Sequence, residues 1–354
     1  MRKIAELRAT LEKMDLDAIL ITNPYNRRYM TNFTGSSGVV FITNSKSLLI
    51  TDFRYIEQAT EQATEFTIVE HKGPIEEELT EIIKKTNIKK LGFEEGNITY
   101  AEYALFKDKF PVHLVPVKNI VESIRVTKTD EEITVLKQAA QIADNAFDHI
   151  LSYIKPGVRE IDIANELEFF MRKQGATSSS FDIIVASGYR SVLPHGVASE
   201  KTIESGELVT LDYGALFKGY CSDITRTIAV GYISEELQKI YHIVLEAQKR
   251  GVKGIKPNMS GKEADALTRD YIEAQGYGKY FGHSTGHGIG LEVHEGPTLS
   301  KRSDIILKKN MVVTVEPGIY IPELGGCRIE DDIVITEEGN ERLTTATKEL
   351  IYVE

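Results

Sequence analysis

The chain has 354 residues, of which 42% are hydrophobic and 27% are charged; this composition is typical of soluble globular proteins and the length allows about two domains. The 42 lysines and arginines against 53 aspartates and glutamates leave a net charge of −11, which argues against a nucleic-acid or membrane partner. No apolar stretch approaches the roughly 20 residues that span a bilayer, and two cysteines are too few for a disulfide scaffold, so we expect a cytoplasmic protein.

The first part of the chain alternates between helical and strand patterns. Apolar residues at helical spacing among the charged residues 2–14 predict an amphipathic helix rather than a secretory signal. Further helices are expected at 53–63, 75–86 and 99–109, and strands at 17–22, on both sides of a turn at 44–46, at 91–95 and near 112–115. This alternation predicts an α/β domain, which we place at residues 1–122.

The remaining residues, 123–354, contain an internal sequence repeat. Thr129 and Glu132 are predicted to form a capping box for a long helix that ends near Tyr153, and a second helix follows from about 160 to 174. Four short motifs recur in the same order, among them 208–214 and 312–318, at offsets of 101 to 104 residues. This repeat predicts a duplicated helix–helix–strand–strand unit, packed about a pseudo-twofold axis.

Acidic residues lie on the predicted strands of the first unit. Residues 208–214 and 221–230 are expected to form a hairpin centred between residues 217 and 218, which would place Asp212 opposite Asp223. Carboxylates directly opposite each other repel, and aspartate is a poor strand former. A bound cation is the simplest compensation.

The second unit repeats the arrangement. Glu316 ends the predicted strand 312–316, and Glu330 lies on its predicted partner 327–335, at positions analogous to Asp212 and Asp223. Four carboxylates match the charge of two divalent cations, and a pair of metal ions is a common device for activating water.

Histidines accompany these carboxylates. His283 and His287 lie in the glycine-rich segment 281–290, His294 follows it, and His195 precedes Asp212. The glycines argue against a regular helix, so we expect a loop near the acidic strands. Cys221 and Cys327 are expected to be small buried hydrophobic residues. Glu295, Asp331 and Asp332 are expected to be solvated or to support neighbouring groups.

These motifs together resemble the pita-bread metallopeptidases, which include prolidase, aminopeptidase P and methionine aminopeptidase. The segments that carry the resemblance are 211–214, 222–227, 282–290, 315–320 and 328–331, and residues 51–55 resemble the accessory domain of the prolidase branch. The resemblance implies an N-terminal accessory α/β domain followed by an α+β pita-bread catalytic domain with the internal duplication.

The resemblance also implies two divalent metal ions. Asp212 would chelate one ion, Asp223 and Glu330 would bridge both, and His287 and Glu316 would complete the ligands of the other. Glu316 would also act as general acid and base. Residues implied to line or support the substrate site are His195, His283, His294, Arg328 and Tyr320. Mn²⁺ suits this oxygen-rich set, with Co²⁺ or Zn²⁺ as alternatives.

The activity implied is hydrolysis of Xaa-Pro peptides by a homodimeric dipeptidase of the prolidase type. An Xaa-Pro aminopeptidase acting on longer peptides is the alternative, whereas methionine aminopeptidases usually lack the N-terminal domain. A metal-free creatinase and an inactive binding module would each lack the full ligand set that is present here.

Overall fold

The computed structural model describes residues 2–354, and these form two compact units. The first unit ends at Arg125 and the second runs from Val126 to Glu354. The limit that we predicted between residues 122 and 123 falls inside α6 (Ile120–Arg125), the last helix of the first unit. No helix within residues 2–354 combines the length and the apolar character that crossing a bilayer requires.

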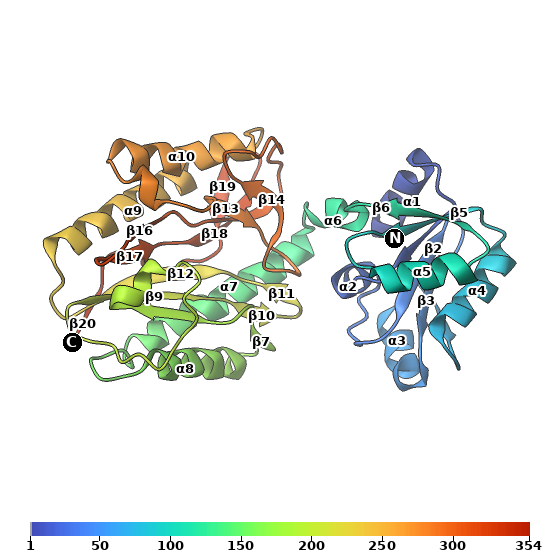
Figure 1. The fold of residues 1–354 in the computed structure, drawn as a ribbon, viewed down its shortest axis with the longest axis horizontal. Helices are drawn as coiled ribbons and strands as arrows, with labels where there is room; N and C mark the ends of the chain where they lie inside the picture. Colours follow the sequence, from blue (N-terminus) through green and yellow to red (C-terminus); the bar gives the residue numbers. More distant parts are fainter. Residues whose placement is uncertain (1) are drawn as a thin grey trace. The chain divides into compact units, whose positions relative to one another are not determined.

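The first unit is built on one mixed sheet with the strand order β4-β3-β2-β1-β5-β6 (Figure 1). Its central strand β1 pairs antiparallel with β2 and parallel with β5. The strands are β1 (Ala18–Ile21), β2 (Val39–Thr43), β3 (Ser47–Thr51), β4 (Thr67–Glu70), β5 (Lys90–Glu94) and β6 (His113–Val117). The helices before α6 are α1 (Arg2–Lys13), α2 (Pro24–Thr31), α3 (Ile56–Gln62), α4 (Ile75–Thr86) and α5 (Tyr100–Lys109). The structure thereby confirms the α/β alternation.

Helix α4 shows how the sequence produces one of these elements. Acidic residues in its first turn and lysines in its last turn complement the helix dipole. Its apolar stripe, Leu79, Ile82 and Ile83, is buried in one cluster with apolar side chains of β1, β2 and β3. The helix therefore has the range that its periodicity predicts.

The second unit contains four long helices and two larger sheets. The helices are α7 (Asp130–Ile150), α8 (Glu160–Lys173), α9 (Glu235–Gly254) and α10 (Gly261–Ala274). One sheet has the order β20-β12-β9-β8 and the other β14-β13-β15-β18-β19. Their strands are β8 (Ile184–Ser187), β9 (Glu207–Tyr213), β12 (Ile224–Val230), β13 (Gly286–Gly288), β14 (Glu295–Leu299), β15 (Val312–Val315), β18 (Asp331–Ile335), β19 (Asn340–Arg342) and β20 (Tyr352–Val353). Smaller sheets are formed by β7 (Ser178–Ser179), β10 (Ala215–Phe217) and β11 (Tyr220–Cys221), and by β16 (Gly318–Ile321) and β17 (Gly325–Arg328).

The predicted duplication is present in the order and length of the elements. Helices of 21 and 14 residues precede β9 and β12, and helices of 20 and 14 residues precede β15 and β18. Capping boxes begin α7, at Thr129 and Glu132 as predicted, and α10, at Ser260 and Glu263. The two strand pairs are both antiparallel.

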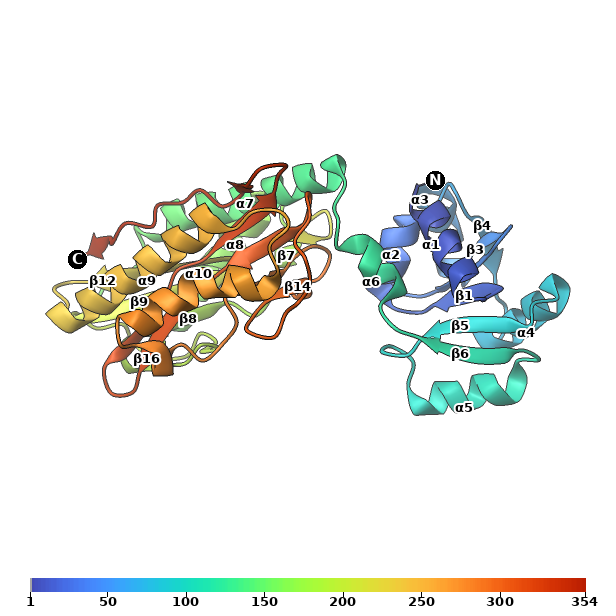
Figure 2. The same ribbon diagram turned by 90° about the horizontal axis from the view of Figure 1, so that it is seen from above.

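Strands lie between two layers of helices in this unit (Figures 1 and 2). Helices α7 and α8 share a buried apolar cluster with β8, β9 and β12, whereas α9 shares another with β16 and β17. The two repeats meet where the amide of Glu330 donates to the carbonyl of Thr225 at 3.1 Å. The predicted acidic positions therefore lie at the centre of the unit.

The register of the first hairpin differs from our prediction. Asp212 pairs with Thr225, not with Asp223. The reason is the turn, in which Lys218 and Gly219 have φ values of 49° and 87°. A two-residue turn with both central residues left-handed matches the strand twist, and it moves the centre of the hairpin one residue along the chain.

Two strands that we predicted to be continuous are interrupted at their acidic residues. Residues 221–230 break between β11 and β12, where Asp223 lies, and residues 327–335 break between β17 and β18, where Glu330 lies. The amide of Asp223 is bound instead by the Asp332 carboxylate at 2.9 Å. These breaks remove both residues from the regular strand ladder.

The glycine-rich segment is only partly the loop that we predicted, because His287 lies on the short strand β13. A Cβ atom at Gly286 would lie 2.0 Å from the carbonyl oxygen of Thr314, and one at Gly288 would lie 1.9 Å from that of Gly296. Glycines on both sides of His287 therefore allow β13 to insert closely between its neighbours.

Candidate metal centre

Carboxylate and imidazole groups converge on one cavity in the second unit. Ligand atoms of Asp223, His287 and Glu330 all lie within 4.8 Å of one another. The Nε2 atom of His287 is 3.4 Å from Oε1 of Glu316. These four residues and Asp212 line a cavity of about 840 Å³. The structure thus brings together all five residues for which the resemblance implies a ligand role.

Three of the carboxylates have a buried oxygen atom that lacks a hydrogen bond. These atoms are Oδ1 of Asp212, Oδ1 of Asp223 and Oε1 of Glu330, and none has a partner among residues 2–354. A buried polar atom without a partner costs free energy, and a cation would satisfy all three. Carboxylates with one imidazole are a donor set that divalent ions accept. The residues present therefore fit a divalent metal ion.

Hydrogen bonds from neighbouring groups orient these ligands. Nδ1 of His287 lies 3.0 Å from the carbonyl oxygen of Gly288, which places the proton on Nδ1 and leaves Nε2 free to face the carboxylates. The Thr314 hydroxyl donates to Oε1 of Glu316 at 3.1 Å, and the Thr225 hydroxyl donates to Oε2 of Glu330 at 2.6 Å. The orientation of these three candidate ligands is therefore set before a metal binds.

Arg328 is a buried cation beside these anions. Its Nη2 donates to Oδ2 of Asp212, and its Nη1 donates to the Tyr320 hydroxyl at 2.8 Å and to the Pro194 carbonyl at 3.1 Å. Arg328 lines the cavity, whereas Tyr320 reaches the site through Arg328 and His283. The contacts give Arg328 a supporting role toward Asp212.

The environment disfavours the anionic form of several carboxyl groups. Burial and mutual repulsion raise the pKa of Asp223 and of Glu330 well above their ordinary values. Burial raises the pKa of Glu316 to about 8, against the opposing charge of Arg328. A cation among these groups would restore the charged forms, so the electrostatics agree with the unpartnered oxygen atoms.

The three remaining histidines of the predicted site differ in whether their ring nitrogens already have hydrogen-bond partners. Both nitrogens of His283 are engaged, with the Ser284 carbonyl at 2.8 Å and the Tyr320 hydroxyl at 2.9 Å. Burial lowers the pKa of His283 to about 4, and Arg328 acts in the same direction. His195 and His294 line the cavity, and neither imidazole has a hydrogen-bond partner among the described residues. His195 and His294 are therefore the two that can bond to a substrate.

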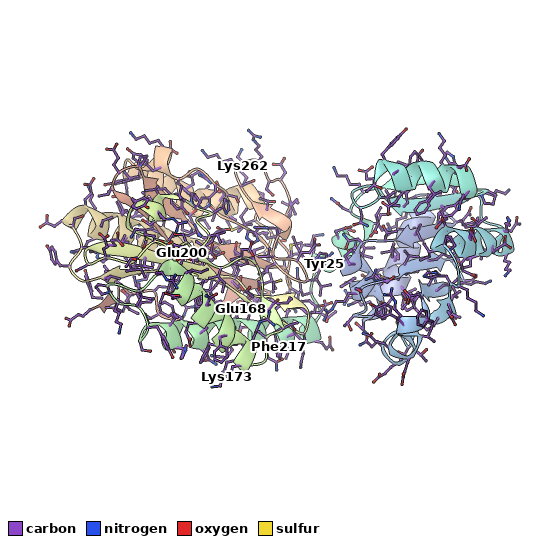
Figure 3. All side chains as sticks on the ribbon, turned by 60° about the horizontal axis from the view of Figure 1, so that its bottom comes forward. Tyr25, Glu168, Lys173, Glu200, Phe217 and Lys262 are labelled. Carbon is purple, nitrogen blue, oxygen red and sulfur yellow. The ribbon has the colours of Figure 1, made fainter. Side chains whose placement is uncertain are left out.

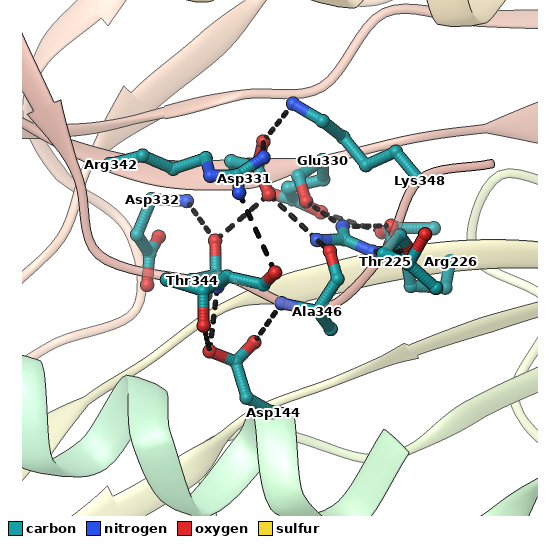
Figure 4. Close-up of polar contacts among 12 residues, drawn as sticks. Asp144, Thr225, Arg226, Glu330, Asp331, Asp332, Arg342, Thr344, Ala346 and Lys348 are labelled. Atoms are coloured by element: carbon teal, nitrogen blue, oxygen red, sulfur yellow. Dashed lines mark hydrogen bonds and ion pairs between the residues drawn. The ribbon is translucent and has the colours of Figure 1, made fainter. Parts of the chain in front are cut away.

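A buried charge network holds the chain at Glu330 and Asp331, where β18 begins (Figure 4). Arg226 donates to the carbonyl oxygen of Glu330 and, at 2.8 Å, to Oδ1 of Asp331, whose Oδ2 lies 2.5 Å from Nζ of Lys348. Although burial opposes it, these two cations hold the pKa of Asp331 below its ordinary value. The Glu330 and Asp331 side chains thus have different partners, the candidate ligand cluster for Glu330 and the buried cations for Asp331.

Three acidic residues named from the sequence have supporting contacts at the site, whereas a lining residue, Phe181, is not indicated by any motif. Asp331 and Asp332, for which we predict solvated or supporting positions, are buried and have supporting contacts. Glu295 also has a supporting contact, an ion pair with Lys128 at 3.2 Å. Phe181 lines the cavity without belonging to any motif; only its place just before β8 indicates it. Both cysteines are buried and free, as predicted.

Comparison with known proteins places this geometry in a family. Residues 134–337, more than half of the chain, match the model of metallopeptidase family M24. The chain belongs to this family. Residues 3–127 match the creatinase/prolidase N-terminal domain, so the first unit is the accessory domain that the resemblance implies.

Relatives of this M24 peptidase extend over its whole length. It is similar to an Xaa-Pro dipeptidase from Bacillus anthracis, with 61% identity, a TM-score of 0.99 and coverage of 100% of this chain and 99% of that one. A curated relative is the Xaa-Pro dipeptidase of Pyrococcus furiosus, 42% identical over 99% of both chains. An X-Pro aminopeptidase from Thermotoga maritima has 41% identity and a TM-score of 0.91, covering 97% of this chain and 99% of that one.

Family membership makes the chain a metallo-exopeptidase with the pita-bread fold and implies divalent metal ions at the cluster described above. The fold and the enzyme class expected from the motifs are confirmed.

Proposed function

We propose that the protein is an Xaa-Pro dipeptidase, which hydrolyses the bond between an N-terminal residue and proline. The observation that carries the proposal is a complete set of five candidate ligand residues, three of them buried and two partly buried, in a chain that matches Xaa-Pro dipeptidases from end to end.

Two metal ions, held as the resemblance implies, would complete this site. Asp212 would bind one, His287 and Glu316 the other, and Asp223 and Glu330 both. When bound, the ions would supply Lewis acidity and a nucleophilic water at neutral pH. The mostly oxygen donors favour Mn²⁺.

The protein's own groups would handle the protons and the developing charge. Glu316 would take a proton from the attacking water and return it to the proline nitrogen, which leaves poorly as an anion. His294 would donate a hydrogen bond to the developing oxyanion, because its nitrogens are free and its ring lies 4.4 Å from that of His287. His195, which also lines the cavity, would contact the substrate.

An Xaa-Pro aminopeptidase is the second candidate, and the likeness to the T. maritima enzyme favours it. The two activities differ in whether the proline is the last residue of the substrate. The cavity is large enough for a dipeptide. The described residues that line it do not indicate a limit on the length of the peptide substrate.

An assay on matched peptides tests the proposal. The metal-stripped protein, with Mn²⁺, Co²⁺ or Zn²⁺ restored separately, is incubated with Ala-Pro, Ala-Pro-Ala and Ala-Ala. We expect the fastest hydrolysis of Ala-Pro with Mn²⁺. Preference for Ala-Pro-Ala would favour the aminopeptidase, and cleavage of neither proline peptide with any ion would contradict both.

A cytoplasmic homodimer is part of the same proposal. Two buried free thiols without a disulfide agree with a reducing compartment. Light scattering on the purified protein and fractionation of the source cells would test the assembly and the location.

A further inference from the structure

His195 is not fixed by contacts of its own side chain. The imidazole lines the cavity but has no hydrogen bond, ion pair or ring contact with any residue from 2 to 354. Its place is therefore set by the backbone of residues 187–199, the His195 segment, which runs from the end of β8 across the wall of the cavity.

One buried carboxylate fastens both ends of the His195 segment. Glu160, the first residue of α8, is fully buried. Its Oε1 accepts from the amide and hydroxyl of Ser187 at 2.8 and 2.9 Å. Its Oε2 accepts from the hydroxyl and amide of Ser199 at 2.7 and 3.2 Å. Five donors in total satisfy this carboxylate, because Nη1 of Arg190 also donates to Oε2.

Arg190 also contacts the segment close to His195. Its Nη2 donates to the carbonyl oxygen of Val197 at 2.8 Å, two residues beyond His195. Figure 3 labels Glu168 and Lys173 on α8 and Glu200, the residue that follows the His195 segment. Within residues 2–354, the hydrogen bonds of the Glu160 carboxylate go to Ser187, Arg190 and Ser199 and to none of the five candidate ligands, so its effect on the segment can be separated from an effect on the metal site.

We propose that Glu160 is a positioning residue for His195, acting through Ser187, Arg190 and Ser199. The inference rests on the proposed function for the use of His195 toward substrate. Displacing a substrate-binding group by about 1 Å can cost roughly 100-fold in rate. Exchanging the carboxylate for an amide replaces one acceptor oxygen by a donor that faces other donors, which opens one end of the segment.

The first test compares Glu160→Gln with Asp162→Asn in the full-length, metal-loaded protein. Asp162 lies in the same turn of α8, but its side chain is about half exposed and, among the described residues, forms its ion pair with Arg159. We expect kcat/KM for Ala-Pro to fall about 10- to 100-fold in Glu160→Gln and to stay unchanged in Asp162→Asn. Metal content, measured by mass spectrometry, should be equal in both.

A double-mutant cycle separates positioning from a general structural effect. If Glu160 acts through His195, Glu160→Gln changes kcat/KM little in a His195→Ala background. An equal loss in both backgrounds, or no loss in either, would overturn the proposal.

Hydrogen exchange gives a readout that does not depend on turnover. Glu160→Gln should raise deuterium uptake of residues 188–198 while the peptides that contain the metal ligands keep theirs; unchanged uptake in the segment would refute the inference. Ser199→Ala removes one donor at one end only, and should show the same change more weakly if Glu160→Gln does not fold. A wild-type protein that cleaves no Xaa-Pro peptide would defeat the proposed function, and the exchange result would still decide the role of Glu160.

Discussion

The unpartnered oxygen atoms of Asp212, Asp223 and Glu330 are the details that connect this fold to its chemistry. Carboxylates in a protein interior are normally hydrogen-bonded or paired. The second oxygen of Asp212 accepts from Arg328, that of Glu330 accepts from Thr225, and Asp223 faces the cluster of candidate ligands. The carboxylates are therefore already oriented, and a cation could bind with little rearrangement of the protein.

Loss of one shared ligand should remove the metal. We expect Glu330→Ala or Asp223→Ala to lower kcat/KM at least about 1,000-fold, roughly 4 kcal/mol of transition-state stabilisation. Metal content after dialysis and hydrolysis of Ala-Pro measure the effect. Glu337→Ala, on the exposed chain just after β18, is the control and should keep both. Full activity with two tightly bound ions in either ligand variant would refute the assignment.

The raised pKa of Glu316 predicts how the metal-free protein responds to pH. The folded state holds a proton up to about pH 8 on a group whose ordinary pKa is 4.5. Between these values the folded state binds more protons than the unfolded state, so the free energy of unfolding falls as pH rises, by up to about 1.4 kcal/mol per pH unit for one group. The lowered pKa of His283 gives the opposite slope below about pH 6.5, so the fall is expected above that value. Thermal unfolding of stripped protein between about pH 6.5 and 8 should show it, and added Mn²⁺ should abolish it; a rising Tm of stripped protein in this range would contradict the prediction.

At the scale of elements, the sequence predicts most helices and strands but not their exact pairing. The range of α4 and the capping box at Thr129 follow from local patterns, which the fold preserves. The register of β9 and β12 does not, because it depends on whether Lys218 adopts a left-handed conformation. The break at Asp223 depends on Asp332, more than 100 residues away in the chain, and no local pattern reports such a contact.

The turn itself offers a test at this scale. Asparagine tolerates the left-handed conformation of Lys218 better than lysine does, and β-branched residues tolerate it worst. We expect Lys218→Asn to stabilise the protein by about 0.5 kcal/mol and Lys218→Ile to destabilise it by about 1 kcal/mol. Urea unfolding measures both, and equal stability of the two variants would argue against the assigned turn.

The ion pair between Lys128 and Glu295 ties the start of the second unit to β14, next to His294. Both side chains are almost fully buried. Lys128→Met leaves a buried carboxylate with lost charge compensation and should cost roughly 3 kcal/mol of unfolding free energy, whereas adding Glu295→Gln should recover part of the loss.

Lys137 provides the matched control for this pair. It pairs with Glu341 at 2.7 Å, but both side chains are about half exposed. Lys137→Met should therefore cost less than about 1 kcal/mol in the same urea titration. Similar losses at Lys128 and Lys137 would show that burial does not strengthen the first pair.

At the scale of the whole molecule, the chain divides into two units with separate cores, and all candidate ligands belong to the second. We therefore expect a chelator to lower the melting temperature of the second unit only. Binding at 100 times the dissociation constant stabilises by about 2.7 kcal/mol. Calorimetry of the full chain with and without EDTA, with proteolysis to assign each transition, measures this; an equal shift of both transitions would contradict it.

The duplication is the feature of the whole chain that is most readily predicted from its sequence. Four motifs recur at nearly the same offset, and this pattern does not depend on the surroundings of any single residue. The five candidate ligands also follow from motifs. What the sequence does not report is the support around them, such as Arg226 behind Glu330 or Glu160 behind His195, since these contacts join segments through tertiary packing alone.

The positions of the ligands along the chain also bear on biosynthesis. The first, Asp212, emerges from the ribosome more than 100 residues before the last, Glu330. A nascent polypeptide therefore carries an incomplete set of donors until Glu330 has been added, and products terminated before that residue would be made without the means to retain their ions.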